Sequence, residues 1–324
     1  MISDIRIDQP IKLPRCGTWP ASVHLFDQPS ADAVLAALAA ERPLLVRGEP
    51  GVGKSQLARA AAQVLGRLFV GSVVHSRSEA QDLQWEYDAV ARLGEAQVLA
   101  SVPSALTPHE RLDPRRYLIP GPLWWVFDWE SARVQSAHHS LCKSSPPAAP
   151  DGWQPAQGSV LLIDEIDKAE ADLPNSLLET LGNGAFPVPW LAEPVGLHPG
   201  CPPPLVVITT NEERELPAAF LRRCMVHKLQ LPAEPAELAA CLVRRGGEHF
   251  GADCTAAVRT LVAEQLIQDR TRARDLGRPA PGQAEYLDIL RALVNARGPD
   301  EVGQRALFTR IARFALDKSG GANS

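Results

Sequence analysis

The sequence predicts an α/β domain built on a parallel sheet, followed by a smaller all-helical domain. Two continuous apolar runs of strand length, at 160–163 and 205–208, are typical of strands in a parallel sheet that is covered on both faces. A glycine-rich loop at 48–53 lies between an apolar strand and a helical stretch. The last third of the chain shows helical patterns alone. We therefore expect domains at 1–232 and 233–324.

Helices and strands alternate along the first domain. Such an order implies right-handed crossovers, with helices on both faces of the sheet. Besides the two long strands, its expected elements are a helix at 31–40, a strand at 44–46, a helix at 56–65, a helix at 173–181 and a short helix at 217–223. The helices expected in the second domain are at 235–245, 255–274, 284–296 and 301–316.

Two segments interrupt the first domain. Residues 144–155 are rich in Pro, Ala, Ser and Gly and are predicted to form a flexible loop. Residues 77–129 are mixed and rich in aromatic side chains, which together with nearby arginines could stack on single-stranded nucleic acid. Acidic residues in the same segment cancel the local positive charge that such binding needs. We favour an inserted helical element with a packed core and one exposed face for a partner.

The composition is that of a globular protein without a membrane span. Hydrophobic residues make up 45% and charged residues 22% of the 324 residues. No apolar run approaches the roughly 18 uncharged residues of a transmembrane helix. The N-terminus lacks the basic and apolar regions of a signal peptide, so we expect a cytoplasmic protein. The six cysteines form no CxxC pair and are expected to be reduced; they are Cys16, Cys142, Cys201, Cys224, Cys241 and Cys254.

The net charge of −5 and the pI near 5.9 leave no overall basic surface for nucleic acid, although a local basic channel stays open.

The glycine-rich loop carries the strongest motif. The residues Gly48, Glu49, Pro50, Gly51, Val52, Gly53, Lys54 and Ser55 match GxxxxGK[ST] at every fixed position. Glycines let the backbone N–H groups surround phosphate oxygens, and the helix that follows adds its positive N-terminal end. We expect Lys54 to neutralise the β- and γ-phosphates of ATP and Ser55 to ligate Mg²⁺.

An acidic pair, Asp164 and Glu165, ends the strand at 160–163. The carboxyl ends of parallel strands face the crevice where α/β sheets bind ligands, and two adjacent carboxylates there need a cation. We expect Asp164 to hold Mg²⁺ and Glu165 to polarise the attacking water. We expect the next acidic residue, Asp167, to form a surface or interface pair with Lys168.

Two further polar features follow the strand at 205–208. Asn211 lies just beyond the strand end, where its amide can orient a water near the γ-phosphate. Arg222 and Arg223 end the short helix at 217–223. The helix dipole alone favours arginines at this end, so a structural role and a role as an arginine finger stay equally open.

The chain resembles AAA+ ATPases, and more narrowly the MoxR group, over about residues 20 to 318. The resemblance rests on GEPGVGKS, LLIDEIDKAEADLPNSLLETL and VITTNEERELPAAFLRRC, and on EYDAVARL followed by DPRRYLIPGPLWW. It implies an AAA+ core with an insertion in its second helix, within 77–129, a β-hairpin insertion at about 184–204, and a helical lid over 233–318.

The same resemblance implies roles and partners. Asn211 matches the family's sensor 1, Arg223 matches the arginine finger better than Arg222, and Arg214 is a further candidate at the subunit interface. It also implies a homo-oligomeric ring of six subunits. The protein partner that it implies is one with a von Willebrand factor A domain.

One departure concerns the lid. Where many AAA+ proteins carry the sensor-2 arginine, this chain has Gln283 and Ala284, with Arg278 several residues earlier. We favour an ATPase that couples ATP turnover to remodelling or activating a partner protein. The alternatives are a nucleic-acid-directed motor subunit and a scaffold that is controlled by nucleotide and hydrolyses it only weakly.

Overall fold

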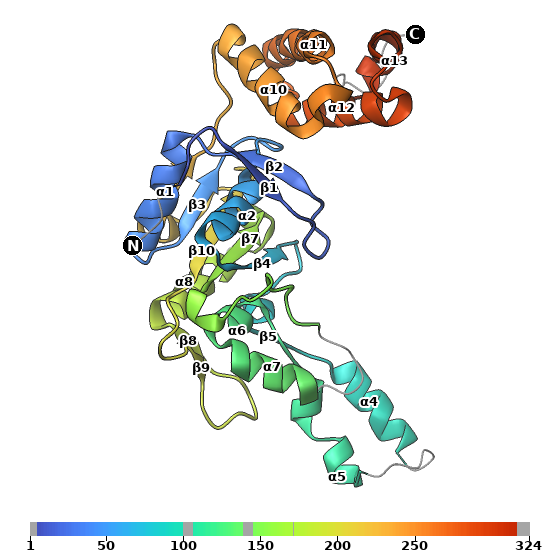
Figure 1. The fold of residues 1–324 in the computed structure, drawn as a ribbon. Coiled ribbons are helices and arrows are strands. Elements are labelled where there is room, and N and C mark those ends of the chain that lie inside the picture. Colours follow the sequence, from blue (N-terminus) through green and yellow to red (C-terminus); the bar gives the residue numbers. More distant parts are fainter. Residues whose placement is uncertain (1–4, 100–105, 139–144, 171, 316–324) are drawn as a thin grey trace.

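The computed structural model describes residues 5–99, 106–138, 145–170 and 172–315. Three predicted features lie outside this part of the chain: Cys142, residue 144 at the start of the predicted flexible loop, and the end of the predicted lid beyond residue 315. Figure 1 shows a central sheet with the C-terminal helices on one side of the molecule and a protruding helical insertion on the opposite side.

The central sheet has five parallel strands in the order β11-β3-β10-β7-β4. Its strands are β3 Leu44–Arg47, β4 Leu68–Val73, β7 Ser159–Asp164, β10 Leu205–Thr210 and β11 Met225–Lys228. The two long apolar runs are neighbours in the sheet, with Leu205 opposite Val160. The predicted parallel sheet is therefore confirmed.

Helices cover both faces of the sheet, and alternate strand residues face opposite cores. In β7, Val160 and Leu162 belong to the core formed with α1 and α2, whereas Leu161 and Ile163 belong to the core formed with α6 and α8. The helices of this part are α1 Gln28–Ala39, α2 Lys54–Leu65, α6 Pro122–Phe127, α8 Asp172–Asn183 and α9 Ala218–Arg223.

The N-terminal segment forms a hairpin that the sequence did not predict. Strands β1, Pro10–Leu13, and β2, Ser22–Leu25, pair in antiparallel fashion. Arg59 of α2 anchors the segment around them, because its guanidinium donates to the carbonyl oxygens of Pro14 at 2.7 Å and Pro20 at 3.0 Å. The hairpin thereby packs against the core that the sheet forms with α1 and α2.

The insertion at 77–129 packs around aromatic side chains. Trp124 and Tyr117 are fully buried, and Trp85, Trp125 and Phe127 are at most 9% exposed. Strands β5 and β6 pair in antiparallel fashion, and α4 and α5 reach away from the sheet (Figure 1). The elements here are α3 Ala80–Gln84, β5 Trp85–Tyr87, α4 Ala89–Val98, α5 Pro108–Arg111, η1 Pro114–Tyr117, β6 Leu118–Pro120 and α7 Trp129–His138. The predicted packed core of the insertion is confirmed.

A second, smaller insertion precedes β10. Strands β8, Ala185–Phe186, and β9, Val195–Gly196, form an antiparallel pair within the range expected for a β-hairpin. Between α7 and β7, residues 145–154 form no helix or strand, and the short 3-10 helix η2, Pro155–Gln157, leads into β7.

Four helices complete the chain and enclose a core of their own. They are α10 Pro235–Phe250, α11 Ala256–Asp275, α12 Gln283–Arg297 and α13 Glu301–Ala315. Their buried side chains form a cluster separate from the two cores of the sheet. All four predicted helices are present, and the exact domain boundary stays a prediction. Across the described ranges, no helix has the length and hydropathy needed to cross a bilayer.

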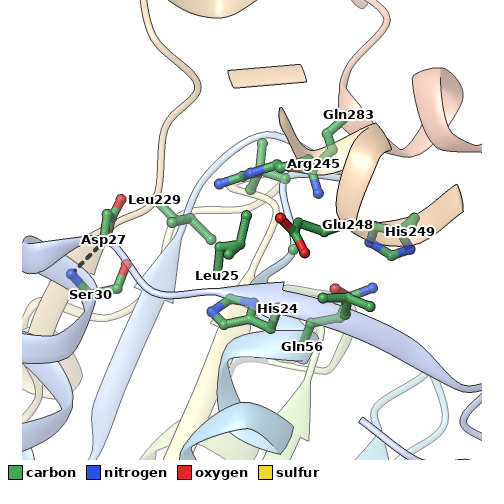
Figure 2. A pocket seen from close by; sticks show the side chains of 13 residues that line it. His24, Leu25, Asp27, Ser30, Gln56, Leu229, Arg245, Glu248, His249 and Gln283 are labelled. Atoms are coloured by element: carbon green, nitrogen blue, oxygen red, sulfur yellow. Dashed lines mark hydrogen bonds between the residues drawn. The ribbon is translucent and has the colours of Figure 1, made fainter. Parts of the chain in front are cut away.

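His24 lies where the N-terminal hairpin meets the C-terminal helices. Its ring packs edge-on against Phe26, with ring centroids 4.8 Å apart, and it shares a small pocket with Arg245 and His249 of α10 (Figure 2). The ring is 9% exposed, and its Nε2 has no hydrogen-bond partner among the described residues. Burial, aided by the charge of Arg245, lowers the pKa of His24 to about 3.

The buried His24 predicts that the protein loses stability in acid. Between about pH 6.5 and pH 3 the unfolded chain binds a proton that the folded chain excludes. Stability from this group is therefore complete above pH 6.5 and falls with decreasing pH, by up to about 1.4 kcal/mol per pH unit. We expect His24→Phe to make the fall in urea-unfolding free energy between pH 7 and pH 5 shallower. The exposed His75, changed to Phe, is the control; equal slopes in both variants would contradict the assignment.

Two glycines of the insertion give a matched test of its packing. A Cβ on Gly121 would lie 2.7 Å from the carbonyl oxygen of Asp82 and 2.8 Å from that of Gln84, whereas one on Gly94 in α4 would meet nothing within 4 Å. We expect Gly121→Ala to destabilise the protein by about 1–3 kcal/mol and lower its unfolding temperature. Gly94→Ala should leave that temperature unchanged or raise it. Equal unfolding temperatures would show that the insertion core is not closely packed here.

Candidate active site

The phosphate-loop motif joins the end of β3 to the start of α2. Three of its glycines, Gly48, Gly51 and Gly53, have positive φ angles of 151°, 77° and 102°. At Gly48 a Cβ would also lie 2.3 Å from the carbonyl oxygen of Leu229, so only glycine fits this position. The loop thus turns tightly enough to direct its N–H groups and the N-terminus of α2 toward one point.

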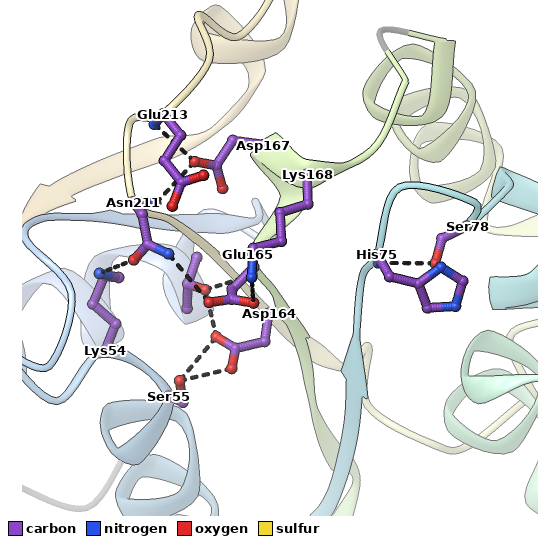
Figure 3. A network of polar contacts seen from close by, with 11 residues as sticks. Lys54, Ser55, His75, Ser78, Asp164, Glu165, Asp167, Lys168, Asn211 and Glu213 are labelled. Carbon is purple, nitrogen blue, oxygen red and sulfur yellow. Dashed lines mark hydrogen bonds and ion pairs between the residues drawn. The ribbon is translucent and has the colours of Figure 1, made fainter.

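Lys54 lies at the centre of this loop and is only 6% exposed. Its ammonium group donates to the carbonyl oxygens of Gly48 at 2.7 Å and Glu49 at 2.9 Å. It also donates to Oδ1 of Asn211 at 2.8 Å (Figure 3). Burial lowers the pKa of Lys54 below its usual value, and the charge of Asp164 opposes this shift most strongly. The structure therefore brings Lys54 and Asn211 together, as the sequence predicts for residues around one phosphate group.

Asp164 links three elements at the carboxyl edge of the sheet. The hydroxyl of Ser55 donates to both carboxylate oxygens of Asp164, at 2.8 and 2.9 Å, and the hydroxyl of Thr209 donates to Oδ1 at 2.5 Å. Thr209 is completely buried in β10. Sequence analysis missed it, because a threonine inside an apolar strand is also typical of ordinary sheet packing.

The oxygens of Ser55 and Asp164 fit a magnesium ion. Mg²⁺ prefers oxygen ligands and commonly takes only one or two carboxylates from the protein, with phosphate and water completing its shell. These two residues are the ones that would hold the ion.

Glu165 follows directly and is held from both sides. Its φ of 61° is unusual for a residue other than glycine and turns the chain sharply at the end of β7. One carboxylate oxygen accepts from Nδ2 of Asn211 at 3.2 Å, and the other accepts from the ammonium group of Lys168 at 2.5 Å. Its backbone N–H donates to Thr209 at 2.9 Å. The carboxylate therefore has a defined position beside Asn211 (Figure 3).

The expected surface pair between Asp167 and Lys168 is wrong. Asp167 is 2% exposed, and one of its carboxylate oxygens accepts from the backbone N–H groups of Asn211 at 3.2 Å and Glu213 at 3.0 Å. Lys168 instead pairs with Glu165. Buried carboxylates need donors, and the turn after β10 provides two, so Asp167 orders the turn that carries Asn211.

The candidate finger residues lie outside the cleft formed by these groups. Arg222 and Arg223 form the exposed end of α9, and within the described part of the chain neither side chain makes an ion pair or a hydrogen bond. Arg214 is also exposed, and its guanidinium donates to the carbonyl oxygen of Ala169 at 3.4 Å. The structure thus brings Lys54, Ser55, Asp164, Glu165 and Asn211 together and leaves the three arginines at the surface.

The helical lid forms one wall of the cleft. The cleft has a volume of about 330 Å³ and is lined by Lys54, Ser55 and the acidic pair on one side and by Gln283, Ala284 and Leu287 of α12 on another. Arg278 lies in an exposed turn after α11 and does not line the cleft. The lid wall is therefore neutral at the position where the family resemblance led us to look for an arginine.

A buried arginine ties the lid to the phosphate loop by a different route. Arg270 of α11 is 4% exposed, donates to the carbonyl oxygen of Pro281 at 2.8 Å and forms an ion pair with Glu49. Sequence analysis did not find this pair, because 221 positions separate its partners. Glu49 therefore contributes a lid contact, in addition to its place in the motif.

A comparison with known protein families gives a match. Residues 43–224 match the family described as AAA domain (dynein-related subfamily). A solved structure of a mutant RuvB from Thermotoga maritima is similar at 15% identity and a TM-score of 0.40, over 92% of this chain and 78% of that chain. Curated proteins give no match. The family match spans more than half of the chain and extends from the strand before the phosphate loop to the end of α9, so the chain belongs to the dynein-related AAA-domain family.

Proposed function

We propose that this chain binds ATP with Mg²⁺ and hydrolyses it within a ring of identical subunits. The observation that carries the proposal is the contact of Asp164 with Ser55, beside a Glu165 that Asn211 holds in place. A loop that binds phosphate, an oxygen site for a metal and a carboxylate for water activation thereby lie within one cleft.

Lys54 and the loop N–H groups would bind the β- and γ-phosphates, and Ser55 and Asp164 would hold the metal. When bound, Mg²⁺ supplies positive charge to the phosphate oxygens. Binding requires Lys54 to exchange some of its three present oxygen contacts for phosphate oxygens, which are stronger acceptors because they are charged.

Glu165 would accept a proton from the attacking water, and Asn211 would orient that water. Lys168 now neutralises one oxygen of Glu165. A base that donates its lone pair to an ammonium group is a weaker proton acceptor, so we propose that Lys168 moves aside when the site is complete.

Arg223 would act on the nucleotide of a neighbouring subunit, in a ring of six. Its support is the exposed side chain, which has no partner in the described part of its own chain, at the end of a short helix. Arg222 is exposed in the same last turn of α9 and Arg214 is exposed as well, so both remain candidates for the contact across the interface.

We further propose that turnover remodels or activates a partner protein in the cytoplasm. The resemblance to the MoxR group supports this proposal, and it points to a partner with a von Willebrand factor A domain. A nucleic-acid motor is less favoured, because most of the aromatic side chains that could stack on bases are buried in the insertion core.

A nucleotide-controlled scaffold is the second candidate. It is favoured by the neutral lid wall at Gln283 and Ala284 and by the ion pair that engages Glu165. Such a protein would bind ATP and assemble with it, but would turn it over only slowly.

Lys54→Ala tests nucleotide binding. Loss of a buried ammonium that contacts phosphate should weaken ATP binding by about 100-fold or more, measured by fluorescence titration with a labelled ATP analogue. Lys228→Ala, on the exposed side of β11, is the control and should bind normally. Unchanged binding by Lys54→Ala would contradict the assignment of the phosphate loop.

Glu165→Gln and Arg223→Ala test hydrolysis within an assembly. We expect wild-type turnover per subunit to rise with protein concentration as rings form, and its molar mass in ATP to exceed that of the monomer. Turnover should fall about 100-fold or more in Glu165→Gln, through loss of the base. It should fall by about 1000-fold in Arg223→Ala, through loss of the finger. Both variants should still bind ATP.

Arg222→Ala and Arg214→Ala are the controls that identify the finger. If one of them loses turnover while Arg223→Ala keeps it, the role passes to that residue. A wild-type protein that assembles with ATP but shows no turnover, with or without a partner, would favour the scaffold over the ATPase.

A further inference from the structure

Arg42 joins the segment before β3 to the end of α9 by hydrogen bonds, and the proposed function gives this residue no role. It lies in the turn between α1 and β3, and its guanidinium reaches the C-terminal end of α9, about 180 positions later. Nε donates to the carbonyl oxygen of Arg223 at 3.0 Å, and Nη2 donates to the carbonyl oxygen of Arg222. One side chain therefore holds the backbone of both arginines.

These two carbonyl groups lie at the exposed end of a helix, where the Arg42 side chain takes the place of water as their partner. The last carbonyl groups of a helix receive no hydrogen bond from the helix itself, and they lie at the negative end of its dipole. A guanidinium group offers several donors in a fixed plane and a positive charge, so it matches two adjacent carbonyl oxygens well. Arg42 thus caps α9 from outside the helix.

Apolar packing fixes the chain just before and just after these two arginines, because half-buried Leu221 and buried Cys224 contact the core formed with α6 and α8. The helix has six residues, and Phe220 is its only residue that is buried. The chain after it is held by β11, which pairs with β3 and begins where the N–H of Met225 donates to the carbonyl oxygen of Pro43 at 2.8 Å. Arg42 and Pro43 are adjacent, so one short stretch before β3 restrains both sides of the turn after Arg223.

We infer that Arg42 is a positioning residue for the arginine finger. Arg42 does not line the cleft around Lys54; it fixes the backbone from which the exposed Arg223 side chain would extend toward the neighbouring subunit. This inference rests on the proposed function of Arg223 as a finger acting on that subunit's ATP. A misplacement of about 1 Å in a catalytic group can lower a rate by about 100-fold, so the restraint has a measurable consequence.

The first test separates turnover from binding. We expect Arg42→Ala to lower kcat about 10- to 100-fold, while KM for ATP and ring assembly change less than about 2-fold. Arg42→Lys keeps the charge and a single donor group and should retain intermediate turnover. Arg67→Ala is the matched control, because Arg67 also donates to a distant carbonyl oxygen, that of Pro203 at 3.2 Å, but far from α9. It should keep wild-type turnover.

The second test asks whether the defect lies in the finger or in the subunit's own site. Arg42→Ala subunits keep Glu165 but present a misplaced finger, whereas Glu165→Gln subunits present a normal finger and lack the base. Mixing the two should therefore restore turnover above that of either variant alone, with a maximum at an intermediate ratio. A defect in the folding or nucleotide binding of the Arg42→Ala subunit would give no restoration.

The outcomes distinguish this inference from the proposed function. Restoration in the Arg42→Ala mixture supports the positioning role, and the same mixture with Arg223→Ala subunits tests the finger itself. Wild-type turnover in Arg42→Ala overturns the role of Arg42. Low turnover that mixing does not restore also overturns it, provided that mixing does restore turnover with Arg223→Ala subunits. Wild-type turnover in Arg223→Ala overturns the proposed finger instead. If Arg42→Ala fails to assemble, the Arg42→Lys variant takes its place in both tests.

Discussion

The structure of the site depends on the carboxylate of Asp164 and the strand order that surrounds it. Asp164 ends β7, Thr209 lies in the neighbouring β10, and Ser55 is the second residue of α2, the helix after β3. Because β10 lies between β3 and β7, a residue from each of these three chain segments meets at one edge of the sheet. A carboxylate 9% exposed is stable only with donors close by, and the two hydroxyl groups provide them.

This arrangement also explains why the residues after Asp164 are so constrained. Glu165 takes a left-handed backbone conformation, and Asp167 then enters the interior to bind the turn that carries Asn211. The carboxylate of Glu165 and the amide of Asn211 therefore belong to two turns that hold each other in place. Hydrogen bonds of Thr209, Asn211 and Glu213 join β10 and the turn after it to the segment that follows Asp164.

The sequence predicted the elements that have a strong local signal. The continuous apolar strands β7 and β10, the phosphate-loop motif and the helices of the C-terminal region are present where expected. It did not predict β4, which is interrupted by Gly71, or β11, whose residues are alternately half-buried and exposed. The buried apolar run of β4, at 68–70, is too short to distinguish a strand from a helix, and β11 buries little apolar surface, so both edge strands are specified by their neighbours in space.

Site residues divide in the same way. Lys54, Ser55, Asp164 and Asn211 were found because their positions after strands or in a motif carry chemical meaning by themselves. Thr209, Asp167 and Arg42 act through partners that are distant in sequence, and their residue types are common in other roles. Only the strand order of the sheet shows which partners they meet, and no local pattern in the chain contains that order.

The ion pair between Arg270 and Glu49 has the largest consequence for how the lid and the loop act together. Arg270 is buried in the lid, whereas the side chain of Glu49 is 52% exposed and belongs to the phosphate loop. Separating the lid from the loop would break this ion pair and leave the guanidinium group its hydrogen bond to the carbonyl oxygen of Pro281. The pair therefore favours a lid that stays on the loop. The chain has glutamine, not arginine, at position 283 of the lid. Arg270 nevertheless gives the lid a cation, and its partner Glu49 belongs to the phosphate loop itself.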